Sequence, residues 1–168
     1  AGSSGPDLLE ERDWNKQRAF FELMMTSVAH MCHLFIPGMA ERGYGRVCNV
    51  ASMAGRITRA AGANYGPSKA YVIAMSQELA LLVADKGVNV SVLCPGFTHT
   101  DFHAAGGMQH VKDRLPGWMW YDADVVVAEG LAAMEAGRAI QISGRLYRWA
   151  DVLTQTPMLR PFLHLARR

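Results

Sequence analysis

Three polar side chains of this sequence could act together on a carbonyl group: Ser52, Tyr65 and Lys69. Tyr65 and Lys69 are four residues apart, so a helix would place both on one face. An ammonium group one turn away lowers the pKa of a phenol from about 10 toward neutral pH, because it favours the phenolate. The phenol could then exchange a proton with a substrate oxygen, to which Ser52 could also donate a hydrogen bond. This arrangement suits hydride transfer, and the hydride must come from a cofactor because no side chain supplies one.

The elements around these residues are predicted to alternate between helices and strands. Such alternation, with continuously apolar strands, indicates a parallel sheet covered by helices on both faces, an α/β fold. Residues 1–10 and 97–121 are predicted loops. The expected order is a helix over Asp13–Met39, a strand over Arg46–Ala51, a helix over Asn64–Asp85, a strand over Val88–Cys94, a helix from Asp122 or Asp124 to Glu135, and a strand over Arg138–Ser143.

Ligands of open α/β sheets bind beyond the carboxyl ends of the strands. Ser52 directly follows the first predicted strand, and Pro95-Gly-Phe-Thr-His-Thr100 directly follows the second. A tyrosine and a lysine four residues apart are common in ordinary helices, and a serine in a turn is usually structural. What favours a functional site is the order of the four features, because Tyr65 comes thirteen residues after Ser52 and Lys69 one turn later.

Three segments resemble signature segments of the short-chain dehydrogenase/reductase family. They are Asn49-Val-Ala-Ser52, Tyr65-Gly-Pro-Ser-Lys69 and Pro95–Thr100, and Leu34-Phe-Ile-Pro-Gly-Met39 fits the same pattern. The resemblance covers roughly residues 1–144 and leaves 145–168 as a helical C-terminal tail. It implies a partial Rossmann-type doubly wound parallel sheet, made of the last three strands and their flanking helices.

The resemblance also implies a reaction, a cofactor and residue roles. The reaction would be hydride transfer between NAD or NADP and a secondary alcohol or ketone. Ser52 would orient the carbonyl, Tyr65 would be the general acid/base, and Lys69 would both lower the pKa of the phenol and bind the nicotinamide ribose. Cofactor contacts are implied for Tyr65, Lys69, Pro95, Gly96, Thr98 and Thr100.

Two departures from the family pattern stand out. The glycine-rich phosphate-binding turn of the family's N-terminal half has no counterpart, and Ala1-Gly2 resembles the end of the family's Asn-Asn-Ala-Gly segment. We therefore expect these 168 residues alone to be inactive. Met24 stands where the family usually has an Asn that helps to hold a water connecting the lysine to solvent. Ser27, one turn away, could substitute, although a plain core role for Met24 is the simpler interpretation.

The loop over residues 97–121 is expected to cover the substrate. Its apolar side chains could line a pocket for a hydrophobic ketone or alcohol, or could only pack the loop onto the domain. His99 and His103 are the histidine pair nearest to metal-ligand spacing, but they are better explained as loop residues, so we expect no metal site. The apolar side chains are Phe102, Met108, Trp118, Met119 and Trp120.

Composition narrows the class of protein further. With 17 basic and 15 acidic residues the chain lacks the basic excess that nucleic-acid binding requires.

Cys32, Cys48 and Cys94 lie in apolar runs, which indicates buried thiols in a reducing cytoplasm. The apolar stretch Phe20–Ile36 contains five polar residues, which argues against a bilayer span. Membrane contact through the tail is conceivable but not favoured, because Pro157 and Pro161 interrupt it.

Three further interpretations concern assembly and rival functions. The helix over Asp13–Met39 is apolar nearly all round, which favours a homodimer or homotetramer in which it and the helix over Asn64–Asp85 form the interface. A non-catalytic relative that keeps the fold for ligand binding or dimerisation is the alternative if Met24 prevents turnover. A sugar-nucleotide epimerase or dehydratase would use the same Tyr and Lys, but would need a larger region after Pro95.

Overall fold

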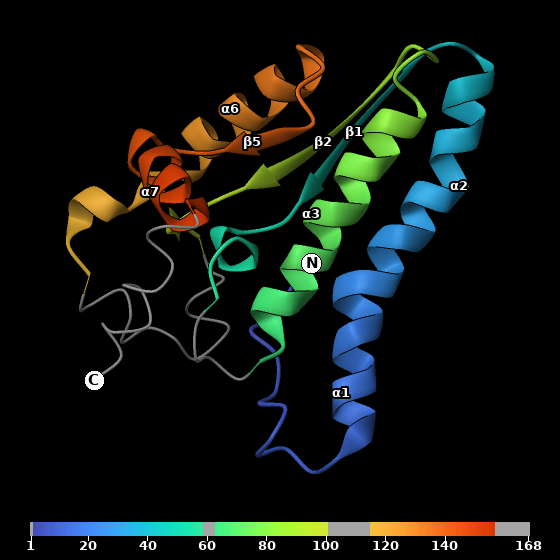
Figure 1. Ribbon diagram of the computed structural model, residues 1–168. Helices are drawn as coiled ribbons and strands as arrows, with labels where there is room; N and C mark the ends of the chain where they lie inside the picture. The colour runs from blue at the N-terminus through green and yellow to red at the C-terminus, as the bar shows by residue number, and fades with distance from the viewer. Residues whose placement is uncertain (1, 59–62, 101–114, 157–168) are drawn as a thin grey trace.

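A three-stranded parallel sheet forms the centre of the computed structural model, which describes residues 2–58, 63–100 and 115–156 (Figure 1). The strands are β1 (Gly45–Val50), β2 (Val88–Cys94) and β5 (Ile140–Ile142), in the order β1-β2-β5. Six residue pairs join β1 to β2, from Gly45–Val88 to Val50–Leu93. The predicted α/β class and parallel sheet are thus confirmed, although the last strand is shorter than Arg138–Ser143.

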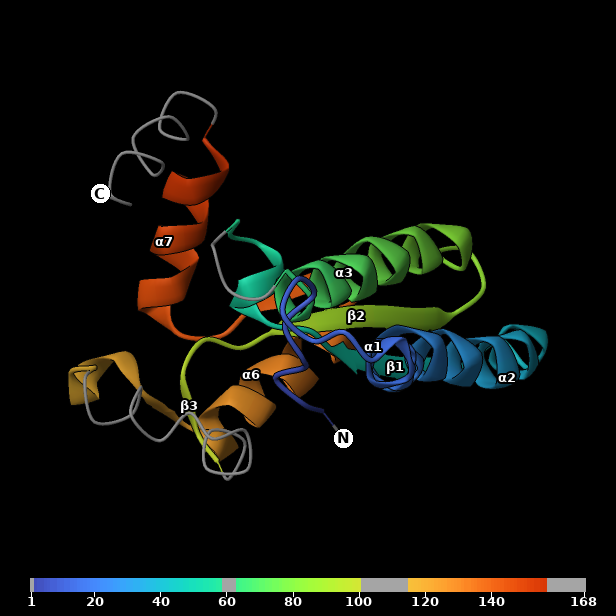
Figure 2. The ribbon, with the colours of Figure 1, turned by 90° about the horizontal axis from the view of Figure 1, so that it is seen from below.

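Alternate side chains of β2 point to opposite faces of the sheet and contact different helices. Val88 and Val90 pack with α2 (Ser27–Glu41) and α3 (Tyr65–Leu82), and Val92 packs with α3. Leu93 points to the other face, where a Cβ at Gly130 of α6 (Ala123–Glu135) would lie 2.8 Å from its Cδ2 atom. Figure 2 shows α3 and α6 on opposite sides of the sheet.

The first helical region is longer and less regular than the predicted Asp13–Met39 helix. It consists of α1 (Trp14–Phe21), a π-helical turn η1 (Glu22–Thr26) and α2, which continues through Pro37 to Glu41. Met24 lies in the π-helical turn and is 2% exposed. One side of α2 packs into the core through Cys32 and Ile36. Its other side leaves an apolar surface, with Met31, Leu34 and Phe35 each more than half exposed.

The 28-residue run Trp14–Glu41 is long and apolar enough to cross a membrane by length and composition. Core helices of globular domains meet the same criterion. Here Cys32 and Ile36 pack against Val88 and Val90 of the sheet, as the side chains of a core helix do.

The predicted loop over residues 97–121 contains regular structure at both ends, contrary to expectation. Strand β3 (Thr98–His99) pairs in parallel with β4 (Tyr121–Asp122), which follows the short 3-10 turn η3 (Gly117–Met119). Phe102, His103 and Met108 lie outside the described residues.

Helix α7 (Arg145–Gln155) lies across the carboxyl end of the sheet (Figures 1 and 2). It follows β5 through Gly144, whose φ of 84° belongs to the left-handed region. A Cβ at Gly144 would lie 2.5 Å from the Tyr121 ring, so glycine also permits close packing here. Residues 157–168 of the predicted tail are outside the described part of the chain.

Candidate active site

Ser52 lies where the β1–β2 pairing continues into the loops beyond the strands. Ala51 N donates to Leu93 O at 2.8 Å, and Met53 N donates to Pro95 O at 2.9 Å. Ser52 is the N-cap residue of the 3-10 turn η2 (Met53–Gly55), and its Oγ accepts a hydrogen bond from Ala54 N at 3.1 Å. The two loops that follow β1 and β2 are therefore joined, and Ser52 lies beside Pro95.

Lys69 connects the first turns of α3 to the end of β1. Its Nζ donates to Val50 O at 3.1 Å and lies 5.8 Å from the centroid of the Tyr65 ring. The residue is 8% exposed, and this burial lowers the pKa of the ammonium group. No ion pair joins Lys69 to a carboxylate within the described ranges of the chain. The buried ammonium group of Lys69 thus lies near the Tyr65 ring.

Two glycines bring the Ser52 turn against the helix that carries Tyr65 and Lys69. A Cβ on Gly55 would lie 2.7 Å from both Lys69 C and Ala70 N. A Cβ on Gly66 would lie 3.0 Å from Ala54 O. Since any side chain would force these backbones apart, the glycines determine how closely Ser52 approaches the helix.

A buried amide pair holds the residue before Tyr65. Asn64 is 2% exposed and donates through Nδ2 to Pro6 O at 2.8 Å and to the Oε1 atom of Gln17. Gln17 is 1% exposed and donates in turn to Asp7 O at 2.8 Å. Ala63 has a φ of 56°, an uncommon conformation for alanine that adds strain at the start of the helix.

The residues of the predicted cofactor loop are not all gathered at one point. Pro95 contacts the Ser52 turn through Met53, as above. Gly96 packs against the ring of Tyr147, which is 2.1 Å from the position of a Cβ on that glycine. Thr98 donates through Oγ1 to Gly96 O at 3.2 Å, and Thr100 is exposed. Both threonines lie along or just after β3, which runs away from the sheet (Figure 2).

The structure also places Met24, and Trp120 of the segment that was expected to cover the substrate. Met24 is buried in the π-helical turn, and the Ser27 hydroxyl donates to Leu23 O of its own helix at 2.6 Å. Ser27 is exposed, so it does not take the place of the family's Asn. Trp120 packs on Phe97 and stacks on His99 with ring centroids 5.4 Å apart, so it joins the two ends of the segment over residues 97–121.

Other features of the site were not expected from the sequence. Arg56 forms an ion pair with Asp151 of α7, and the Tyr147 hydroxyl joins Phe97 to Met119. The buried amide of Gln17 was missed as well. An Asn at the very start of the predicted helix Asn64–Asp85 is the one local signal that could have drawn attention to Asn64, whereas the contacts of α7 depend on tertiary packing. Within the described ranges, no three His, Cys, Asp or Glu side chains are grouped to hold a metal ion.

Together the fold and the site define a class: α/β proteins with a Ser, Tyr and Lys set at the carboxyl end of a parallel sheet. Comparison with known proteins then specifies the family. The family model described as short chain dehydrogenase matches residues 1–109, more than half of the chain. The chain belongs to the short-chain dehydrogenase family.

Curated relatives and solved structures agree with this assignment. Over 148 residues the chain is 28% identical to the 3-oxoacyl-(acyl-carrier-protein) reductase FabG of Escherichia coli strain K12, covering 83% of this chain and 59% of the relative. Over 147 residues it is 34% identical to Nodulation protein G of Azospirillum brasilense, covering 82% and 58%. Over 103 residues it is 36% identical to the acetoacetyl-CoA reductase of Cupriavidus necator, covering 61% and 40%. The chain thus spans about two-fifths to three-fifths of these relatives.

Solved structures match the whole chain at the level of the fold. A short-chain dehydrogenase from Sphingobium yanoikuyae in complex with NADPH aligns with a TM-score of 0.76 and 21% identity, covering 100% of this chain and 63% of that one. A short chain dehydrogenase from Burkholderia cenocepacia J2315 in complex with NADP aligns with a TM-score of 0.78 and 21% identity, covering 100% and 68%.

Proposed function

We propose that the full-length protein is an NAD(P)-dependent oxidoreductase that interconverts a secondary alcohol and a ketone, with Tyr65 as general acid/base. The observation that carries the proposal is the buried Lys69 ammonium beside the Tyr65 ring, at the strand end that leads into Ser52. Burying an ammonium group costs free energy even when it donates a hydrogen bond, and such perturbed groups cluster at functional sites. Relatives named as reductases of 3-oxoacyl and acetoacetyl thioesters support a ketone substrate.

The residues present fit a nicotinamide cofactor. NAD(P) would supply or accept the hydride. A lysine ammonium has three N–H donors, and Val50 O takes one of Lys69, which leaves donors for ribose hydroxyls. Solved structures of short-chain dehydrogenases with this fold contain NADPH, NADP or NAD. The sequence has no counterpart of the family's phosphate-binding turn, so we expect the 168 residues alone to show no saturable binding in a micromolar NADPH or NADH fluorescence titration.

Side chains of this chain would orient the substrate, transfer the proton and contact the cofactor. Ala54 N donates to Ser52 Oγ, so the hydroxyl keeps its proton free to donate to a carbonyl oxygen. Tyr65 gives a proton to that oxygen or takes one from it. Lys69 stabilises the phenolate form of Tyr65, because a cation close to a phenol favours its charged form. Thr98 and Thr100, on the segment after Pro95, would approach the nicotinamide side of the cofactor.

The finer parts of the proposal concern substrate, assembly and place in the cell. A hydrophobic ketone or alcohol suits the apolar loop residues, and a cytoplasmic location suits the free thiols of Cys32, Cys48 and Cys94. A homodimer or homotetramer would cover the exposed Met31, Leu34 and Phe35. The alternative is a non-catalytic binding or dimerisation protein, which the burial of Met24 in place of a water-binding Asn favours.

The test uses the full-length protein with NADH or NADPH and a panel of acetoacetyl-CoA, a longer 3-oxoacyl thioester and a cyclic ketone. Tyr65→Phe should lower turnover by a factor of about 100 to 10,000 and leave cofactor binding intact. Tyr71→Phe is the matched control, because Tyr71 is on the same helix and 42% exposed. Retention of more than about a tenth of the rate in Tyr65→Phe would exclude Tyr65 as proton donor. Cofactor binding without any turnover would support the non-catalytic alternative.

A further inference from the structure

A bidentate ion pair between Arg56 and Asp151 joins the Ser52 turn to helix α7. Arg56 Nε donates to Asp151 Oδ1, and Arg56 Nη2 donates to Asp151 Oδ2, both at 2.7 Å. Asp151 is 7% exposed, so most of this pair is shielded from water. One turn further along α7, Gln155 Nε2 donates to the backbone oxygen of Arg56 at 2.7 Å. Both the side chain and the backbone of Arg56 are therefore held by α7.

Arg56 and Ser52 are the two ends of one short turn. Gly55 N donates to Ser52 O at 3.0 Å, and Arg56 N donates to Met53 O at 3.0 Å. A 3-10 turn of three residues has too few hydrogen bonds to be rigid by itself. Besides the packing of the turn on α3, the position of Ser52 therefore depends on what holds the two ends, which are Pro95 at the Met53 end and Asp151 at the Arg56 end.

The other end of α7 holds the second strand-end loop. The Tyr147 hydroxyl accepts a hydrogen bond from Phe97 N at 3.1 Å and donates one to Met119 O at 2.7 Å. Its ring covers Gly96. One helix thus contacts the loop after β1 through Asp151 and the loop after β2 through Tyr147.

We propose that α7 is a positioning element of the active site and that Asp151 is the positioning residue through which it orients Ser52. The expected effect on kcat rests on the proposed function, whereas the expected effect on the conformation of the Ser52 turn does not. Asp151 does not touch the reacting atoms. It holds Arg56, and a misplacement of the Ser52 turn by about 1 Å would cost up to about a hundredfold in turnover.

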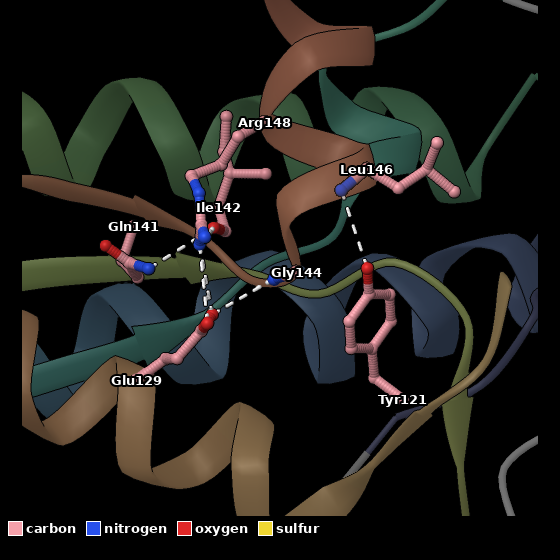
Figure 3. Close-up of polar contacts among 7 residues, drawn as sticks. All are labelled: Tyr121, Glu129, Gln141, Ile142, Gly144, Leu146 and Arg148. Atoms are coloured by element: carbon pink, nitrogen blue, oxygen red, sulfur yellow. Dashed lines mark hydrogen bonds and ion pairs between the residues drawn. The ribbon is translucent and has the colours of Figure 1, made fainter. Parts of the chain in front are cut away.

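A second ion pair on the same helix provides a matched control (Figure 3). Arg148 Nη1 lies 3.3 Å from Glu129 Oε2, and it also donates to Ile142 O at 3.2 Å. The same Glu129 oxygen accepts a hydrogen bond from Gly144 N at 3.0 Å. These contacts join α7 to α6 and β5 rather than to the Ser52 turn. Glu129→Gln therefore weakens contacts of α7 with α6 and leaves the Arg56–Asp151 pair in place.

The kinetic test compares Asp151→Asn, Arg56→Lys and Glu129→Gln in the full-length protein. Asp151→Asn places an amide N–H against a guanidinium N–H, and Arg56→Lys keeps the charge but cannot make both hydrogen bonds. Both should lower kcat about tenfold or more and leave the KM for NAD(P)H within about twofold. Glu129→Gln should keep kcat within about twofold at a comparable loss of Tm. An unchanged kcat in Asp151→Asn, or an equal loss in Glu129→Gln, would overturn the proposal.

Hydrogen exchange separates this proposal from the proposed function, because it requires no turnover. The amides of Gly55 and Arg56 should exchange about tenfold faster in Asp151→Asn than in the wild type, and at wild-type rates in Glu129→Gln. If the wild type oxidises no cofactor but this pattern holds, the proposed function fails and the positioning by Asp151 stands. If the two variants exchange alike at these amides, the positioning proposal fails whatever the activity.

Discussion

The side-chain amide of Asn64 donates a hydrogen bond to Gln17, and this contact joins helix α1 to the residue that precedes Tyr65. Asparagine before a helix usually caps it by accepting a hydrogen bond from the backbone. Asn64 makes no such cap and uses both of its N–H groups for Gln17 and Pro6 instead. The start of the helix that carries Tyr65 is thus held by the N-terminal segment.

Replacement of Gln17 by Met should lower the free energy of unfolding by about 1–3 kcal/mol, because it leaves a buried Asn64 N–H without its acceptor. Turnover should fall as well, since Tyr65 follows Asn64 directly. Denaturant unfolding and steady-state kinetics measure the two effects. Lys16→Met is the control, as Lys16 is adjacent and its ion pair with Glu11 is exposed. Equal losses in both variants would contradict a specific role for the Gln17–Asn64 pair.

Replacement of Lys69 by Met should abolish turnover without loss of stability at pH 7. Burial lowers the pKa of Lys69 below 10.5, so the folded state binds its proton less readily than the unfolded state. Protonated Lys69 therefore destabilises the folded state. This destabilisation is fully present at pH values below the pKa that Lys69 has in the folded state, and it disappears as the pH rises toward 10.5. The variant's stability relative to wild type should therefore be greatest near neutral pH. A variant less stable than wild type by more than about 1 kcal/mol would show that the Val50 hydrogen bond outweighs desolvation.

Cys94 should resist alkylation in the folded protein. Burial raises the pKa of its thiol to about 12, so very little thiolate exists at pH 8. Burial also raises the pKa of Cys48, but that residue is only half-buried. Mass spectrometry after a short iodoacetamide pulse should find Cys48 labelled before Cys94, and denaturant should expose both. Early labelling of Cys94 would mean that the strand end opens readily.

Gly55→Ala and Gly66→Ala should each destabilise the protein by about 1–3 kcal/mol and reduce turnover, because a methyl group would push η2 away from α3. Gly55 should be the more sensitive, since its Cβ would meet backbone atoms at 2.7 Å. Gly117→Ala is the control, because nothing lies within 4 Å of its Cβ position. Thermal unfolding and kcat give the two readouts. Wild-type behaviour of Gly55→Ala would show that the turn can shift without consequence.

The sequence predicted the elements whose patterns are long enough to be distinctive. The valine alternation of Val88–Cys94 predicted the observed strand, and the third helix ends at Glu135 as expected, just before Gly137 with its φ of 68°. The predicted helix Asn64–Asp85 was too long at its C-terminal end, because α3 ends at Leu82. Strands β3 and β4 were missed, because two residues each are too few to show a period of two. The π-helical turn around Met24 was missed too, since this helix is apolar nearly all round and a shift of its pattern by one residue cannot be recognised.

The site was predictable to the extent that its residues are ordered along the chain. Ser52 follows a strand, and Tyr65 and Lys69 lie at the start of the next long helix, so the topology of a parallel sheet brings them to the same end of the sheet. Asp151 could not be paired with Arg56 in the same way. Both are charged residues of a kind that is usually solvated on the surface, and their contact exists only because α7 lies at the carboxyl end of the sheet.

Arg56 and Asp151 are 95 residues apart, and this separation has a consequence for how the protein is made. At about 5–20 residues per second, a ribosome needs at least several seconds to deliver Asp151 after Arg56. During that interval β1 can find β2, because Gly45 pairs with Val88, yet the turn after β1 still lacks its C-terminal anchor. A nascent chain would therefore pair β1 with β2 first and acquire the final placement of Ser52 only when α7 emerges.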